Sequence, residues 1–76
     1  MKEIVEIIIL NLVDNKDAVE IKEVAGEKYI IYEVKVANSD MGRVIGKQGR
    51  LAKSIRTLIK AIAAKEQKKV TVEFIE

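Results

Sequence analysis

The sequence predicts an α+β fold whose elements follow in the order helix, strand, strand, helix, helix, strand. Apolar residues recur with a period of two over residues 18–37 and again over residues 69–75, which is typical of strands with one buried face. They recur with a helical period over Lys2–Val13 and Arg50–Lys65. We therefore expect one domain, residues 1–76, with a three-stranded mixed sheet and three helices on one face.

The first element, Lys2–Val13, is expected to be a helix. Its isoleucines and valines also suit a strand, but its length favours a helix. The predicted apolar stripe at helical spacing consists of Ile4, Val5, Ile8 and Leu12. The segment is far shorter than the roughly 20 residues that a bilayer span requires, so no membrane insertion is expected.

An antiparallel hairpin is expected over Ala18–Ala37, with its turn at residues 25–28. The last strand is expected at Lys69–Ile75. Two helices lie between the second and third strands and permit a right-handed crossover connection, so we expect these strands to be parallel neighbours.

The segment Met41–Lys65 is expected to hold a short helix, a glycine loop and a longer helix. Side-chain oxygens of residues 38–40 are expected to cap the helix Met41–Ile45, which the loop Gly46–Gly49 ends. The helix Arg50–Lys65 has a broad apolar arc whose large residues are expected in the core, while its small Ala52 and Ala63 either leave room for a groove or pack closely against the sheet. Its members are Leu51, Ala52, Ile55, Leu58, Ile59, Ile62 and Ala63.

Positive charge is concentrated in Met41–Lys65. The segment holds seven of the chain's 14 Lys and Arg residues and no carboxylate, although the net charge of the whole chain is only +2. Lys53, Arg56 and Lys60 follow one margin of the apolar arc. Such a one-sided field attracts a polyanion, while a solvated helix face is the alternative explanation.

The composition argues against an enzyme and against a bound metal or other cofactor. The chain has no Cys and no His, so it lacks thiolate and imidazole catalysts and the usual zinc ligands. Carboxylates such as Glu20 and Glu33 fall at outward strand positions, where solvated charge is the usual explanation. A reducing, cytoplasmic location fits the lack of cysteine.

The loop Ile45-Gly46-Lys47-Gln48-Gly49 does not match the common phosphate motifs. A Walker loop has four residues between its glycines and a Ser or Thr after its Lys, whereas three residues separate Gly42 from Gly46 and Gln48 follows Lys47. The Gly-x-Gly of a dinucleotide loop is also lacking. Two glycines nevertheless allow a sugar–phosphate backbone to approach closely, and the start of the following helix favours anions.

The stretch Val44–Ile55, with this loop at its centre, resembles the signature of the K-homology (KH) domain. The element order of the whole chain is similar to the type II, bacterial form. The resemblance implies a non-catalytic protein whose groove holds about four nucleotides of single-stranded RNA, acting as a post-transcriptional regulator or RNA chaperone. Ala52 departs from the pattern, because many members carry a large aliphatic residue there, and this predicts a shallower groove floor.

Carried over to this sequence, the implied RNA-binding residues form three sets. The residues implied to meet the RNA backbone are Gly46, Lys47, Gln48 and Gly49. The residues implied to form the groove floor are Val44, Ile45 and Ala52, with core packing as the alternative role of Val44 and Ile45. The residues implied along the loop and the basic wall are Arg43, Arg50, Lys53 and Arg56. Lys68 and Lys69 are secondary candidates.

The resemblance also implies protein partners, namely a second copy in a homodimer and a larger KH-containing protein in a heterodimer. The wide apolar surfaces of Lys2–Val13 and Arg50–Lys65 favour such contacts. The alternative function is therefore a dimerisation module with weak RNA binding or with single-stranded DNA binding. The chain has only three aromatic residues, which argues against a sheet surface that stacks bases.

Overall fold

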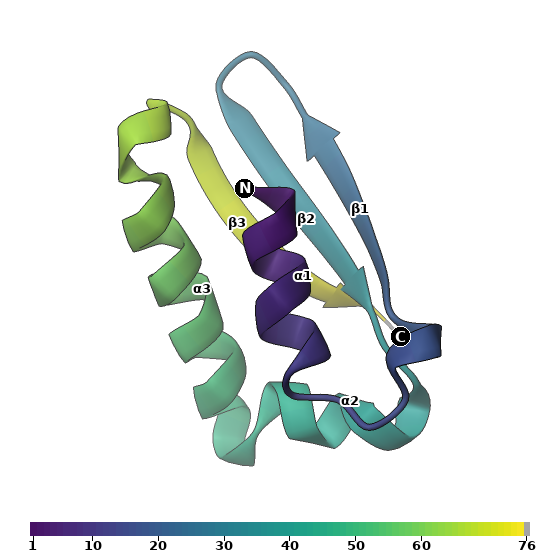
Figure 1. Ribbon diagram of the computed structural model, residues 1–76. Coiled ribbons are helices and arrows are strands. Elements are labelled where there is room, and N and C mark those ends of the chain that lie inside the picture. Colours follow the sequence, from purple (N-terminus) through teal and green to yellow (C-terminus); the bar gives the residue numbers. More distant parts are fainter. Residues whose placement is uncertain (76) are drawn as a thin grey trace.

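The computed structural model describes residues 1–75, without the side chain of Glu66. It confirms the predicted fold class and element order (Figure 1). The helices are α1 (Lys2–Leu10), α2 (Asn38–Ile45) and α3 (Arg50–Ile62). The strands are β1 (Glu20–Ala25), β2 (Tyr29–Lys35) and β3 (Lys69–Ile75). Short 3₁₀ turns occupy Lys16–Ala18, Lys47–Gly49 and Ala63–Glu66.

The sheet has β2 at its centre. β1 pairs with β2 in the antiparallel sense, and the turn between them is closed by the N–H of Gly26, which donates to the carbonyl oxygen of Tyr29 at 2.9 Å. β3 pairs with β2 in the parallel sense, with Tyr32 opposite Val72. The hairpin and the parallel pairing are therefore both confirmed, and β3 is an edge strand.

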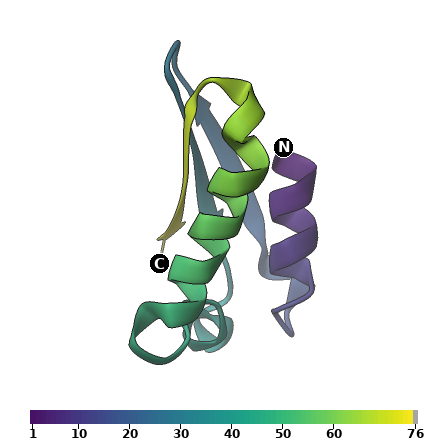
Figure 2. The same ribbon diagram turned by 90° about the vertical axis from the view of Figure 1, so that its left-hand side faces the viewer.

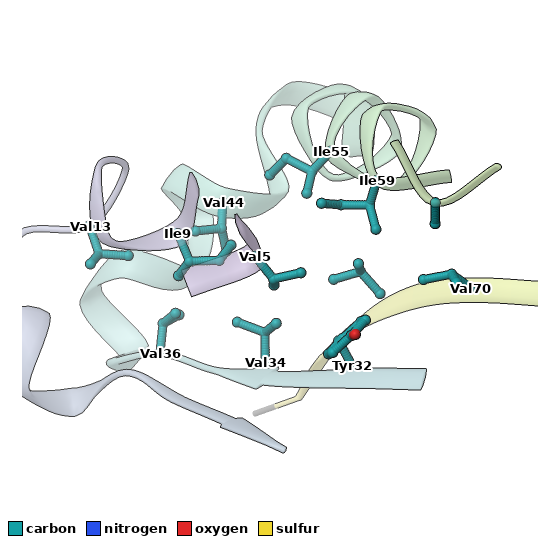
Figure 3. Close-up of a cluster of buried hydrophobic side chains, with 12 residues drawn as sticks. Val5, Ile9, Val13, Tyr32, Val34, Val36, Val44, Ile55, Ile59 and Val70 are labelled. Atoms are coloured by element: carbon teal, nitrogen blue, oxygen red, sulfur yellow. The ribbon is translucent and has the colours of Figure 1, made fainter. Parts of the chain in front are cut away.

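Helices α1 and α3 cover one face of the sheet, and α2 crosses one end of this layer (Figures 1 and 2). Their apolar side chains meet those of the strands between the two layers (Figure 3). The buried cluster consists of Val5, Ile9, Val13, Tyr32, Val34, Val36, Val44, Ile55, Ile59, Ala63, Val70 and Val72. No helix among residues 1–75 has both the length and the apolar character needed to cross a membrane.

The face that α1 buries differs from the predicted stripe. Its fully buried residues are Val5 and Ile9, which are four apart, whereas Ile4 is 37% exposed. The helix also ends at Leu10, earlier than expected. Both the backbone N–H of Asn11, at 3.2 Å, and its side chain, at 2.7 Å, donate to the carbonyl oxygen of Ile7 in the last turn of the helix.

The prediction that Leu58 and Ile62 belong to the core is wrong. Leu58 is 49% exposed and Ile62 is 40% exposed, while Ile55 and Ile59 are buried. Each residue turns an α-helix by about 100°, so Leu58 lies about 100° around α3 from Ile59. The part of α3 that faces the sheet is therefore narrower than the apolar arc in the sequence.

Candidate nucleic-acid interface

The loop Gly46–Gly49 joins α2 to α3 in a turn that requires glycine. Gly46 has φ 75° and ψ 179°, a conformation that is essentially restricted to glycine, and a Cβ atom there would lie 2.7 Å from Cβ of Leu51. Gly49 is left-handed with φ 73°, but a Cβ atom there would meet nothing within 4 Å. The packing of the protein itself thus requires Gly46, whereas Gly49 leaves the loop surface open to a ligand.

Lys47 and Gln48 form the exposed tip of this loop. Gln48 is also left-handed, with φ 57°, and its Oε1 accepts a hydrogen bond of 3.4 Å from Nη2 of Arg50. Arg50 is the first residue of α3. The N–H of Arg50 donates to the carbonyl oxygen of Lys47 in the preceding turn. The positive end of the α3 dipole and the two cationic side chains beside it nevertheless favour the same kind of ligand, an anion.

The residues implied to form the groove floor lie mostly beneath the surface. Val44 is fully buried and Ala52 is 2% exposed, while Ile45 is half-buried. Val44 and Ala52 come from α2 and α3, on either side of the loop, so their packing supports the angle between these helices.

Arg56 is held between α3 and the edge strand β3. Its Nε donates a hydrogen bond of 2.8 Å to the carbonyl oxygen of Val72, and its guanidinium carbon lies 5.8 Å from the centre of the Phe74 ring. Lys53 precedes Arg56 by three residues and Lys60 follows it by four, so the three cations share one face of α3. In this basic row, Arg56 lies at the seam between α3 and the free edge of β3, Lys60 lines a hollow with Lys69 and Val70 of β3, and Lys53 lies further out on α3 beside Ser54 and Thr57.

The basic row ends at an open hollow of about 200 Å³ at the far end of α3. It is lined by Lys60, Ala63, Ala64, Lys68, Lys69 and Val70. The 13 residues of α3 separate the hollow from the glycine loop by about 20 Å. Among the described side chains, its three lysines form no ion pair, so their charge is available to an anion.

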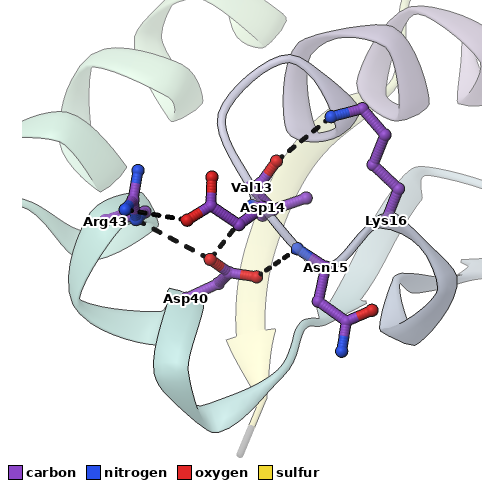
Figure 4. A network of polar contacts seen from close by, with 6 residues as sticks. All are labelled: Val13, Asp14, Asn15, Lys16, Asp40 and Arg43. Atoms are coloured by element: carbon purple, nitrogen blue, oxygen red, sulfur yellow. Dashed lines mark hydrogen bonds and ion pairs between the residues drawn. The ribbon is translucent and has the colours of Figure 1, made fainter.

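Asp40 is the only buried charged residue in the described part of the chain, with 1% exposure. Its Oδ1 accepts the backbone N–H of Asp14 at 3.1 Å, and its Oδ2 accepts that of Asn15 at 3.0 Å (Figure 4). These two bonds lower the pKa of Asp40 below its ordinary value, and Arg43 and Lys16 add to the shift. The prediction that residues 38–40 cap α2 with their side chains is wrong, because α2 begins at Asn38 without a side-chain cap.

Arg43 lies in the same polar network (Figure 4). Its Nη2 is 2.8 Å from Oδ2 of Asp14, and its Nε is 3.7 Å from Oδ1 of Asp40. Of the seven cations in Met41–Lys65, it is the only one with an ion pair among the described side chains. Sequence reasoning did not identify either carboxylate as its partner. The available signal was the spacing of three residues between Asp40 and Arg43 on one helix.

The described residues offer no metal site, and no exposed aromatic ring lies beside the glycine loop. Within residues 1–75, no group of acidic residues is arranged to hold a metal ion. Tyr32 is buried and Phe74 is half-buried near Arg56. Tyr29 is 46% exposed, but it lies beside Gly26 at the hairpin end of β2, away from the glycine loop. A ligand at this interface would therefore meet backbone and cations rather than exposed rings.

Comparison with known proteins gives the family. The model of the KhpA/KhpB KH domain matches residues 2–74. The chain belongs to this family. Its relatives include the RNA-binding protein KhpA of Clostridium perfringens, 61% identical over 75 residues, which are 99% of this chain and 100% of the relative.

Two further KhpA/KhpB family members are similar over almost their full lengths. The RNA-binding protein KhpA of Caldanaerobacter subterraneus subsp. tengcongensis is 60% identical over 99% of this chain and 100% of its own. That of Aquifex aeolicus is 46% identical over 100% of this chain and 96% of its own. No solved structure matches the chain significantly. The resemblance to the KH domain is confirmed.

Proposed function

We propose that this chain is a non-catalytic domain, spanning residues 1–76, that binds single-stranded RNA in the cytoplasm. The observation that carries the proposal is the loop Gly46–Gly49, which is open at Gly49 and continues into the basic row of α3. The KhpA relatives carry the name RNA-binding protein, which supports RNA as the ligand.

The proposed binding mode uses the loop and the α3–β3 seam for about four nucleotides. Gly46–Gly49 meets the sugar–phosphate backbone, with Lys47 and Arg50 beside the phosphates. Lys53 and Arg56 form the wall along the seam. The exposed part of Ile45 contributes apolar surface, while Val44 and Ala52 support it from below.

Replacing both residues of the loop tip tests this mode. The double variant K47D/Q48D should lose RNA binding in a fluorescence anisotropy titration, because it places two carboxylates where the phosphates approach, while its circular dichroism spectrum stays unchanged. The variants K47D and K2D form a pair that controls for net charge, because each changes it by the same amount. Lys2 is exposed at the start of α1, at the opposite end of the helix layer (Figure 2). K2D should bind RNA normally. Retained binding by K47D/Q48D would contradict the proposal, and tighter binding of DNA of the same sequence would assign DNA as the ligand.

Exposed apolar side chains favour dimerisation as a second function of the domain. Leu58 and Ile62 are 49% and 40% exposed on α3, and Ile7 is 60% exposed on α1. A homodimer that covers the α3 surface would bring two weak RNA sites together and raise the overall affinity. Sedimentation at high micromolar concentration should show a dimer that I62E converts to a monomer. A wild-type monomer at that concentration would contradict the homodimer.

We further propose that the domain acts as a post-transcriptional regulator or RNA chaperone together with a KhpB-type KH protein. The shared KH-domain family of KhpA and KhpB supports a matching surface on such a partner. Crosslinking and sequencing of bound RNA in cells that contain or lack the partner would test this. Identical RNA sets in both cells would contradict a joint role.

A further inference from the structure

Arg43 has two acidic partners that differ in how firmly they are held. Asp40 is buried, and its two oxygens accept the amides of Asp14 and Asn15, so its carboxylate is fixed. The Asp14 side chain is 75% exposed, and Arg43 is its only side-chain partner within the described residues. Exposed ion pairs contribute little to stability, so the bond between Arg43 and Asp14 can be exchanged for another anion at little cost.

The position of Arg43 exposes it to a ligand on the glycine loop. It lies in the last turn of α2, where the N–H of Gly46 donates to the carbonyl oxygen of Gly42 at 2.9 Å. The Arg43 side chain is 57% exposed. The preceding residue, Gly42, is exposed, and a methyl group there would meet no atom of other parts of the chain within 4 Å, so nothing else covers the surface of α2 beside Arg43. A guanidinium binds phosphate and carboxylate with the same forked geometry.

We propose that Asp14 is an internal competitor of RNA: it holds Arg43 in the free protein, and a phosphate of the bound strand replaces it. Asp14 thereby lowers the affinity of the site, although it lies in the α1–β1 connection and outside the basic segment. This inference rests on the proposed RNA-binding function.

The variant D14N tests the competition with little effect on the fold. The substitution keeps the size of the side chain, and the backbone N–H of residue 14 can still donate to Asp40. It removes only the charge that pairs with Arg43. RNA affinity should rise about two- to fivefold, which corresponds to the free energy of an exposed ion pair. The melting temperature of the free protein should stay equal or fall slightly, so the gain in affinity should come without a gain in stability.

Two controls separate competition from general electrostatics. D17N changes the net charge equally but removes a carboxylate that has no ion pair among the described residues, and it should raise affinity much less than D14N. In the R43Q background, D14N should change RNA affinity no more than D17N does, because Arg43, for which Asp14 and RNA compete, is no longer present.

Three results would overturn the inference: weaker RNA binding by D14N, equal effects of D14N and D17N, or an undiminished effect of D14N in the R43Q background. The first would make Asp14 a residue that positions Arg43 for the ligand. The proposed function itself fails on different results, namely retained binding by K47D/Q48D or no RNA binding by the wild-type chain.

Discussion

Arg56 and Val72 are joined by a hydrogen bond of 2.8 Å from Nε to the backbone carbonyl oxygen, across the seam between α3 and β3. The bond uses one of the five guanidinium donors. The four Nη donors have no hydrogen-bond partner among the described residues, so the same side chain can support the edge strand and meet a phosphate.

Removing Arg56 should therefore cost stability as well as binding. R56A should lower the free energy of unfolding by about 1–2 kcal/mol, because it loses the bond to Val72 and the contact with the Phe74 ring. K53A, which removes an exposed cation from the same row, should change stability by less than about 0.5 kcal/mol. Urea denaturation measures both values, and equal effects would show that Arg56 does not stabilise the seam.

The glycines around the loop should respond differently to a methyl group. G46A should destabilise the protein by about 2 kcal/mol or more, because its backbone conformation is restricted to glycine and its Cβ atom would clash with Leu51. G49A should cost about 1–2 kcal/mol, since only the left-handed backbone opposes it. Thermal or urea denaturation gives the ranking, and an equal loss in both variants would contradict it.

Gly42 should behave in the opposite way. It lies within α2 with open space above it, so G42A should raise the free energy of unfolding by about 0.5–1 kcal/mol through higher helix propensity. The same variant should weaken RNA binding, because its methyl group narrows the approach to Arg43. Unchanged RNA affinity in G42A would show that the ligand does not pass this point.

Asp40 should make the protein sensitive to acid. Its pKa is lowered in the folded protein, chiefly by the amides of Asn15 and Asp14. The Asp40 carboxylate therefore contributes its full stabilisation at pH values above the pKa that this group has in the unfolded chain, about 4. The stabilisation is lost as the pH falls through the lower pKa of the group in the folded protein. In melting curves, D40N should be less stable than the wild type at pH 7, and the difference should narrow below about pH 4. A constant difference down to pH 2 would contradict this role.

Salt should weaken RNA binding to a predictable extent. If about three phosphates are neutralised, the logarithm of the affinity should fall against the logarithm of the salt concentration with a slope of about −2. K47Q should reduce the magnitude of this slope by about 0.7, which is the contribution of one phosphate contact on a single strand. A slope near zero for the wild type would mean that cations do not carry the binding.

Much of the candidate site could be proposed from the sequence because its residues are close together in the chain. The loop is defined by two glycines three residues apart, and the row Lys53, Arg56 and Lys60 follows from helical spacing alone. The ion pair between Arg43 and Asp14 was not predictable in this way. Asp14 lies 29 positions earlier in the chain, and nothing local distinguishes it from other exposed carboxylates.

The sequence by itself determined the order of the elements and the antiparallel hairpin, because the period of each segment and its turns depend on neighbours a few residues apart. The parallel pairing of β2 with β3 joins distant residues and followed from the crossover connection. Only the tertiary structure decided which side of each apolar helix is buried. Ile9 rather than Ile4 faces the sheet, and Leu58 is left exposed, because the width of the sheet limits how much of a helix it can cover. It also decided that Asp40 binds the amides of residues 14 and 15 instead of capping its own helix, since a buried carboxylate takes the strongest donors that the fold brings to it.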